Sequence, residues 1–520
     1  MESEERYPIG EQDFRNLRKG GYVYVDKTGY IKKLISKGNK YIFLARPRRF
    51  GKSLLLSTLK CFFEGERELF KGLEIESMEW DWASYPVLHL DFNQEKYAEP
   101  GKLEPTLDHL LGKWEERYGV TKIAVGLPAR FRNVIEAAHA TTGRQVVILV
   151  DEYDKALVGN IHKRKIYEHY RERLAAMFTN FKSAAEHIRL VFITGVGRFG
   201  RLSIFSDLNN LNDISFWDEY ADICGITERE LHERLQSGIR KFAEKHRLDF
   251  ESAVRELKEN YDGYRFTAEG SDIYNPWSLF NALEKSAIRN YWNETGMPTL
   301  LAESLRDLDV DLKKIFNSYC REDDLQGLDL LNPNPQALLY QTGYLTIKGY
   351  NPKIKKVRLG IPNREVKDGL YHFLLPYYMK VKSETIKKTL DEISDGFILG
   401  NPEEAMKAMQ TYFAGVDYKL KIENENNFHN VFFLLVDLLG LTTKAESHTS
   451  DGSIDIMIET VDYIYIIELK YDHSAEDALE QIKEKRYGRP FQRDSREIIN
   501  IGVSFSSKTR CIEGWIIERG

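Results

Sequence analysis

The chain contains little cysteine, and its few cysteines lie far apart. Only four occur in 520 residues, at Cys61, Cys224, Cys320 and Cys511. None belongs to a C-x-x-C pair, so the sequence argues against a zinc cluster or a disulfide framework. We therefore expect a reducing, cytoplasmic environment.

Long hydrophobic runs are also missing, and the longest apolar stretches are well short of a membrane span. The first ten residues, MESEERYPIG, are acidic and lack the basic-then-apolar order of a secretory signal peptide. These absences predict a protein without a membrane segment. With only 15 prolines and no low-complexity tract, long flexible linkers are not expected either.

A strong charge of one sign is absent as well, since the net charge is −6. Bulk electrostatics therefore do not favour a polyanionic partner, and any contact with nucleic acid has to come from local basic patches. Two short runs qualify, His162–Lys165 (HKRK) and Lys353–Arg358 (KIKKVR). Such runs are more often solvated surface than binding sites.

What is present is a set of short apolar runs separated by amphipathic segments in the first two hundred residues. The expected buried strands are Tyr41–Ala45, Val87–Phe92, Val146–Val150 and Leu190–Thr194, with helical patterns at Leu54–Phe63 and Arg171–Ala185. Apolar strands that alternate with helices are typical of a parallel sheet covered on both faces. We therefore predict an α/β fold for this part of the chain.

The pattern changes twice further along. After Gly225 it becomes helical, starting with the capping box Thr227–Glu230. From about residue 401 it predicts a helix at Phe428–Leu439, a hairpin, a helix at Ala475–Lys485 and a last strand. We predict four segments: an α/β core (1–225), a helical lid (226–285), a mostly helical middle region (286–400) and a C-terminal α/β domain (401–520).

The stretch Phe50-Gly51-Lys52-Ser53 lies between an expected strand and an expected helix. At this position backbone N–H groups and a helix N-terminus favour phosphate. Gly51 allows close approach of the backbone, Lys52 would reach the β- and γ-phosphates, and Ser53 would place its hydroxyl on Mg²⁺. Arg46 occupies the position where the common pattern G-x-x-x-x-G-K-[ST] has its first glycine.

A second element supports a nucleotide site. The expected strand Val146–Val150 runs directly into Asp151 and Glu152. An aspartate there can hold the Mg²⁺ shell, and the adjacent glutamate can orient or deprotonate the attacking water. Thr194, at the end of another expected strand, is placed to contact the γ-phosphate or that water. Two such elements about a hundred residues apart make a chance match improbable.

Together these segments resemble the bacterial AAA-ATPase-like family. The matching stretches are YVDKT (24–28), RPRRFGKS (46–53), VDEYD (150–154), ITGV (193–196), SIFSDLNNL (203–211), YDGYRF (261–266) and YNPW (274–277). The resemblance implies a P-loop ATPase core with ATP and Mg²⁺ as cofactors, in which Arg46 is a family feature. It also implies that Arg46, Arg49 and Phe50 belong to the nucleotide loop. Arg198, Arg201 and Arg265 are candidate sensor or finger arginines, and Tyr7–Asp13 is expected to close over the adenine.

Three charged residues stand out in the C-terminal hairpin. Asp455 lies in SIDIMI (453–458), and Glu468 and Lys470 end YIYIIELK (463–470). Residues i and i+2 share one strand face, so Glu468 and Lys470 project together, and hairpin pairing can bring Asp455 beside them. Carboxylates so placed bind Mg²⁺ or Mn²⁺, and the lysine can position or help deprotonate an attacking water.

This pattern resembles the PD-(D/E)XK nuclease superfamily and implies a restriction-endonuclease-like α/β domain. The resemblance assigns Glu425, in ENNFH (425–429), to the metal shell with Asp455 and Glu468. It places Gln481 as a polar residue facing the substrate. Ile454 stands where the superfamily's name has proline, a common and chemically minor departure.

The leading hypothesis is an ATPase that regulates metal-dependent cleavage of nucleic acid, DNA being the favoured partner. The alternative is a regulatory or signalling ATPase whose nuclease-like domain binds nucleic acid or a partner without cleaving. A role in defence or mobile-element biology is compatible with both. The sequence leaves homo-oligomerisation open.

Overall fold

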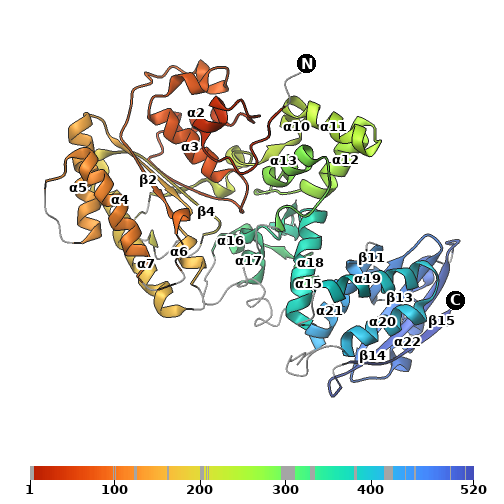
Figure 1. Ribbon diagram of the computed structural model, residues 1–520. Helices are drawn as coiled ribbons and strands as arrows, with labels where there is room; N and C mark the ends of the chain where they lie inside the picture. The colour runs from red at the N-terminus through yellow and green to blue at the C-terminus, as the bar shows by residue number, and fades with distance from the viewer. Residues whose placement is uncertain are drawn as a thin grey trace. The chain divides into compact units, whose positions relative to one another are not determined.

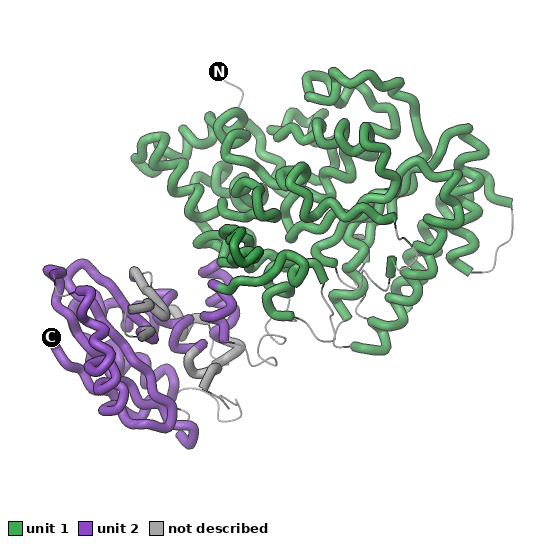
Figure 2. The backbone as a smooth tube through the Cα atoms, turned by 180° about the vertical axis from the view of Figure 1, so that it is seen from behind, with its two compact units in different colours: residues 1–296, 318–366 green, residues 297–317, 367–520 purple. Residues whose placement is uncertain are grey.

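A computed structural model describes residues 5–520 except 96, 98, 100, 122–125, 161–162, 199–203, 206–207, 209, 294–310, 328–333, 380–382, 415–424, 440, 450–451, 492 and 510. The chain divides into two compact units (Figure 2). Unit 1 comprises Met1–Gly296 and Ser318–Val366, and unit 2 comprises Met297–Asn317 and Lys367–Gly520. Residues of the predicted middle region thus fall into both units.

Unit 1 is built on a five-stranded sheet whose strand pairs are all parallel, in the order β2-β3-β4-β1-β5. Its strands are β1 (Tyr41–Ala45), β2 (Val87–Asp91), β3 (Val146–Asp151), β4 (Ile188–Gly195) and β5 (Asn212–Asp213). Every residue of β3 is buried, as expected for a strand covered on both faces. The predicted parallel α/β core is confirmed.

Helices cover this sheet, and Figure 1 shows α3 on one side of it and α4, α5 and α7 on the other. The helices of this part are α1 (Phe14–Lys19), α2 (Thr28–Ser36), α3 (Lys52–Phe63), α4 (Leu103–Tyr118), α5 (Leu127–Thr142), α6 (Lys155–Val158), α7 (Arg164–Phe178) and α8 (Asn180–Ser183). Because parallel strands need crossover connections, the loops that follow the strands meet at one edge of the sheet.

A helical part of unit 1 follows, with its own apolar core. Its elements are β6 (Ile226–Thr227), α10 (Glu228–Arg234), α11 (Gln236–His246), α12 (Phe250–Tyr261), β7 (Ile273–Tyr274) and α13 (Pro276–Lys285). The predicted capping box at Thr227 is present, with Glu230 bonding back to the Thr227 backbone. Tyr7, from the N-terminal segment, packs in the same core as Phe242 and Leu283.

The rest of unit 1 pairs short helices with a small antiparallel sheet in the order β8-β10-β9. The elements are β8 (Tyr319–Cys320), α16 (Glu322–Gln326), α17 (Pro335–Thr342), β9 (Thr346–Asn351) and β10 (Lys356–Gly360). Helix α18 (Arg364–Met379) begins in unit 1 and continues into unit 2. The sequence predicts this region as mostly helical with some strand-like pieces, such as Tyr344–Ile347, which overlaps the start of β9.

Unit 2 contains a mixed five-stranded sheet in the order β11-β12-β13-β14-β15. The strands are β11 (Thr442–Thr449), β12 (Gly452–Glu459), β13 (Tyr463–Tyr471), β14 (Glu497–Ser506) and β15 (Cys511–Arg519); the helices are α15 (Leu312–Ile315), α19 (Ser383–Ile398), α20 (Pro402–Ala414), α21 (Glu425–Asp437) and α22 (Ala475–Glu484). The predicted β12–β13 hairpin and the helix α22 are confirmed, whereas the strands β11 and β15 were not foreseen.

Helix α22 is the crossover that makes β13 and β14 parallel, and it packs on both strands (Figure 1). The helix is amphipathic, and its buried residues are Ala475, Ala478, Leu479 and Ile482. Gly502 of β14 lies so close to the helix that an added Cβ would be 2.3 Å from the Ala475 carbonyl oxygen. This close approach brings polar groups of α22 within reach of the β13 side chains.

Candidate functional site

The loop between β1 and α3 leads into a helix N-terminus that no side chain caps. Gly51 is the N-cap of α3 and has a φ of 92°, and no side chain caps the helix. Arg49 also has a left-handed backbone, with a φ of 69°. A non-glycine residue in this region costs about 1–3 kcal/mol, so surrounding contacts must hold the loop in place.

Lys52 is the first residue of α3, and it is only 4% exposed. Its Nζ donates hydrogen bonds to the carbonyl oxygens of Arg46 and Pro47, each at 3.0 Å. The lysine side chain thus links the end of the loop to its beginning. An ammonium group held in place by two backbone carbonyls is preorganised to meet an anion.

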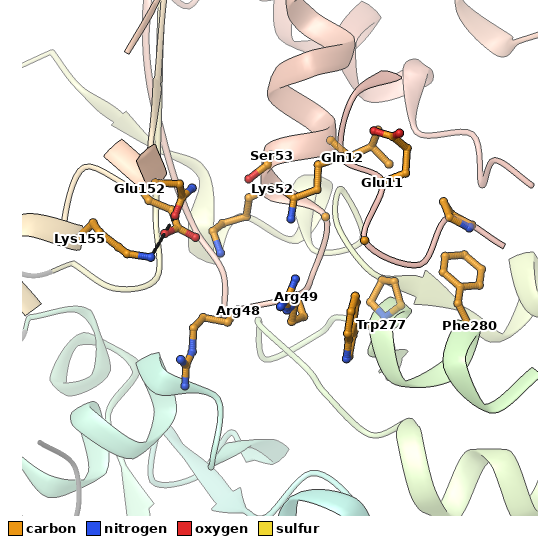
Figure 3. A pocket seen from close by; sticks show the side chains of 16 residues that line it. Glu11, Gln12, Arg48, Arg49, Lys52, Ser53, Glu152, Lys155, Trp277 and Phe280 are labelled. Atoms are coloured by element: carbon orange, nitrogen blue, oxygen red, sulfur yellow. Dashed lines mark hydrogen bonds and ion pairs between the residues drawn. The ribbon is translucent and has the colours of Figure 1, made fainter. Parts of the chain in front are cut away.

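A cavity of about 410 Å³ opens beside this loop (Figure 3). This volume lies in the range of small-molecule sites. Its walls come from the N-terminal segment, the loop, the end of β3 and the start of α13. The lining residues are Pro8, Gly10, Glu11, Gln12, Arg48, Arg49, Gly51, Lys52, Ser53, Leu54, Asn93, Glu152, Lys155, Pro276, Trp277 and Phe280.

Glu152 directly follows β3 and lines the cavity (Figure 3). Its φ of 49° is in the left-handed region, which turns the chain sharply after the strand. Lys155 lies 3.4 Å from its carboxylate and also donates to Asn93 Oδ1 at 3.1 Å. The carboxylate therefore faces Lys155 at the cavity wall.

Asp151 lies deeper, at 3% exposure, and is not among the lining residues. Its carboxylate accepts hydrogen bonds from the Thr194 hydroxyl, at 2.7 Å, and from the Ser53 hydroxyl. Burial raises the pKa of Asp151, and these two bonds oppose that rise. The structure therefore brings together Ser53, Asp151 and Thr194, three residues predicted from separate parts of the sequence.

Asp154 joins the ends of β3 and β4, a role the sequence did not reveal. Its carboxylate accepts the backbone N–H groups of Val196 and Gly197, each at 3.0 Å. Burial raises the pKa of this carboxyl to about 7. The aspartate thus fixes the loop after β4 beside the nucleotide loop.

Arg46 and Phe50, both predicted as cofactor-binding residues, are placed outside the cavity lining. The guanidinium of Arg46 is buried, donates to backbone carbonyls that include those of Ser215 and Tyr220, and covers the Phe266 ring at 4.3 Å. Phe50 packs edge-on against the rings of Tyr264 and Phe266. Their side chains shape the loop from behind, which explains why an arginine can replace the usual glycine.

The candidate sensor arginines do not line the cavity either. Arg198 forms a buried ion pair with Asp213 and lies over the Phe216 ring at 4.6 Å. Arg265 pairs with Asp272 at 2.9 Å. Arg201 lies outside the described residues.

An aromatic wall that was not predicted as part of the site faces the loop. Trp277 and Phe280 are one turn apart on α13, and the guanidinium of Arg49 lies over the Trp277 ring at 4.2 Å (Figure 3). The signal in the sequence was YNPW, in which Asn275 caps α13 and Pro276 starts it. Of the predicted N-terminal segment 7–13, four residues line the cavity, including Glu11 and Gln12.

In unit 2 the hairpin register brings Asp455 to Glu468. Ile456 of β12 pairs with Ile467 of β13, and the Asp455 carboxylate accepts the Leu469 N–H at 3.0 Å. Glu468 is buried, and Lys470 Nζ lies 4.0 Å from its carboxylate. The three predicted residues therefore form one cluster.

Gln481 of α22 completes this cluster from the helix side. Its amide oxygen accepts a hydrogen bond from Lys470 Nζ at 2.5 Å, and its amide nitrogen donates to Glu468 Oε1. The Gln481 amide thus holds the Lys470 ammonium and the Glu468 carboxylate at fixed positions, as residues around metal ligands commonly do.

The other carboxylate oxygen, Glu468 Oε2, is buried without a hydrogen-bond partner. Burial, with the nearby Asp455 charge as the second cause, raises the pKa of Glu468 to about 8. An unpaired carboxylate oxygen beside a second carboxylate is a costly arrangement that a divalent cation would relieve. Asp455 and Glu468 therefore fit Mg²⁺ or Mn²⁺.

Glu425 is the first residue of α21, but its side chain lies outside the description, as does that of His429. Within the described residues, no group of three or more histidine, cysteine, aspartate or glutamate side chains is placed to hold a metal ion. The assignment of Glu425 to the metal shell stays a prediction. Sequence reasoning did not find Lys313, whose Nζ donates to the Asp455 carbonyl oxygen at 2.7 Å.

Comparison with known proteins gives one family match within unit 1 and another within unit 2. Residues 8–205 match the AAA-ATPase-like family, described as predicted AAA-ATPase, and residues 423–515 match the PD-(D/E)XK nuclease superfamily. The chain belongs to the family of AAA-ATPase-like proteins that carry a C-terminal PD-(D/E)XK nuclease superfamily domain.

One relative spans the whole chain. It is an Azotobacter chroococcum mcd 1 protein named "Uncharacterized protein in vnfD 5'region", 34% identical over 529 residues, with 99% of each chain covered. The similarity therefore extends over both units of the chain. In the part of the chain that the structure describes, none of the helices has the length and apolar character needed to span a bilayer.

Proposed function

We propose that the chain hydrolyses ATP in unit 1 and that unit 2 cleaves phosphodiester bonds in nucleic acid with the help of a divalent metal. The observation that carries the proposal is the cluster of Asp455, Glu468, Lys470 and Gln481, with its unpartnered buried carboxylate oxygen. The cluster combines two carboxylates that can bind a divalent metal with the positively charged ammonium group of Lys470. Metal-dependent cleavage of a phosphodiester requires both.

In unit 1, the proposal assigns the phosphates of ATP to the loop at Gly51–Ser53. Lys52 would exchange the Arg46 and Pro47 carbonyls for phosphate oxygens, a stronger charge-assisted bond. Ser53 and Asp151, already hydrogen-bonded to each other, would hold Mg²⁺, which neutralises phosphate charge when bound. Glu152 would accept the proton of the attacking water.

In unit 2, Asp455 and Glu468 would hold the divalent metal, with Glu425 as a further ligand. When bound, the metal supplies polarisation of the scissile phosphate and of water. Lys470, oriented by Gln481, would position the attacking water and stabilise the negative charge that develops on the phosphate. The Gln481 bond to Glu468 keeps the carboxylate beside Asp455.

A basic cavity in unit 2 supports nucleic acid as the partner. It measures about 460 Å³ and is lined by Ile482, Lys483, Arg486, Gly488, Arg489 and Asn500. Its lining begins at Ile482, the residue after Gln481 in α22. Arginines in such a position suit the phosphate backbone, whose charge dominates nucleic-acid affinity.

The proposal is tested with purified full chain, Mg²⁺ or Mn²⁺, and plasmid or single-stranded DNA or RNA, with and without ATP. We expect metal-dependent cleavage that ATP alters and that EDTA abolishes. ATP turnover without cleavage of any substrate would overturn the nuclease part and favour the alternative, a regulatory ATPase whose second domain only binds. Cleavage without ATP turnover would overturn the ATPase part.

A further inference from the structure

Residues 311–317 lie outside both family matches and carry no recognisable motif. They belong to unit 2, although the chain returns to unit 1 at Ser318. Their only regular element is α15, which is four residues long. The position of this short segment therefore has to be explained by its contacts and not by its own stability.

These contacts anchor α15 against α21. The Leu312 backbone N–H donates to the side-chain oxygen of Asn430 at 2.9 Å, and Leu312 and Asn430 are both buried. Phe316 stacks on Tyr371 with ring centroids 5.8 Å apart and lies 6.4 Å from Phe433. The segment is thus fixed on both sides of Lys313.

Lys313 is half-buried and points to the carboxylate cluster, where its Nζ donates to the Asp455 carbonyl oxygen at 2.7 Å. The side chain of the same aspartate accepts the Leu469 N–H. Asp455 is therefore held at its backbone by Lys313 and at its carboxylate by β13.

The neighbouring lysine shows what an ordinary surface residue of this segment does. The side chain of Lys314 is 70% exposed, and its Nζ pairs with Asp311 at 3.1 Å within the same turn. The two lysines have the same chemistry and adjacent positions but opposite surroundings. Lys313 donates to the Asp455 carbonyl oxygen, whereas Lys314 pairs with Asp311.

We propose that Lys313 is a positioning residue of the nuclease-like site, which fixes Asp455 in the orientation that metal binding and cleavage require. This inference rests on the proposed function of unit 2. It adds to that site a cation supplied from more than a hundred residues before the matched nuclease domain. Residues that orient metal ligands in this way are typically worth about 10–100-fold in metal affinity or activity.

The test compares the full chain with Lys313→Met, Lys313→Arg and the matched control Lys314→Met. The measurements are Mn²⁺ affinity by calorimetry and kcat and KM for cleavage of a labelled oligonucleotide. We expect Lys313→Met to weaken Mn²⁺ binding and to lower kcat by about 10-fold or more, with KM unchanged. Lys313→Arg should restore most of the loss, and Lys314→Met should match the parent.

Parental Mn²⁺ affinity and kcat in folded Lys313→Met would overturn the inference, and so would a rise in KM alone. If Lys313→Met does not fold, Lys313→Gln takes its place, with an intermediate loss expected and parental values again contradicting the role. A parent that cleaves nothing would count against the proposed function only, because Mn²⁺ affinity still compares the lysine variants.

Discussion

The candidate site of unit 1 is mainly positive and lies at a loop, whereas the candidate site of unit 2 is mainly negative and lies on paired strands. In unit 1, a lysine, two arginines and an uncapped helix N-terminus gather at a loop, as an anion requires. In unit 2, two carboxylates gather on paired strands, as a cation requires. Each site also contains one residue of the opposite charge, which is Glu152 in unit 1 and Lys470 in unit 2.

The difference teaches where each site is vulnerable. The loop site depends on left-handed backbone at Arg49, Gly51 and Glu152, which packing behind the loop must hold. The sheet site depends on register, because a slip of one residue would turn Asp455 to the other face of β12. Changes in the packing behind the loop should therefore distort the first site, whereas a change of register would remove Asp455 from the second.

The largest effect is expected for Glu152→Gln. Loss of the proton acceptor should slow ATP hydrolysis by about 10²–10⁴-fold, while ATP affinity stays near parental because the phosphate contacts remain. Steady-state hydrolysis and calorimetry on the same preparation measure the two quantities. Parental turnover would show that Glu152 is not the base.

Lys470→Ala should affect only the other unit. We expect nucleic-acid cleavage to fall by about 10²–10³-fold, because charge on the transition-state phosphate is no longer stabilised. ATP turnover by the same protein serves as the control and should stay unchanged. Retained cleavage would leave Lys470 as a structural partner of Gln481.

Lys52→Ala should weaken ATP binding by about 1.5–3 kcal/mol, the value of a hydrogen bond to a charged group. Part of this loss would come from a disturbed loop conformation, because Lys52 also donates hydrogen bonds to the carbonyl oxygens of Arg46 and Pro47. Adenosine binding, which lacks the phosphate contacts, separates the two causes. Equal ATP affinity in variant and parent would contradict the phosphate-loop assignment.

Glu468→Gln tests the cost of the buried carboxylate. The folded pKa of Glu468 is raised to about 8, so its contribution to stability is present at low pH and lost as pH rises through about 8. Without metal above that pH, the variant should be more stable than the parent by about 1–3 kcal/mol. The measurement is the unfolding of unit 2 in EDTA across pH 5–9, and Mn²⁺ should stabilise only the parent. A pH-independent difference would argue against an ionising Glu468.

The smallest effect is expected for the double change Arg486→Ala and Arg489→Ala. Removing two phosphate contacts should lower nucleic-acid affinity modestly and reduce the salt slope by about 1.4–1.8. The expected kcat is parental, in contrast to Lys470→Ala. Fluorescence anisotropy at several salt concentrations measures the slope, and an unchanged slope would remove these arginines from the interface.

Several elements were predictable because their signals are local. The strands of unit 1 are continuous apolar runs, and β1 was predicted with the bounds it has, Tyr41–Ala45. The capping box at Thr227 and the β12–β13 hairpin follow from short-range patterns. The strands β11 and β15 escaped prediction because sequences such as TTKAESHT lack regular apolar alternation.

The sequence by itself determined that the chain has a phosphate-loop pattern and a carboxylate–lysine hairpin, because each motif spans few residues and its spacing follows backbone geometry. The tertiary structure decided the rest. It placed Trp277 and Phe280 on the wall of the cavity, buried Arg46 behind the loop, and brought Lys313 to Asp455 across more than a hundred residues. Such contacts depend on how distant elements pack. The hydrophobic periodicity of the sequence around each residue does not indicate which distant residue it will contact.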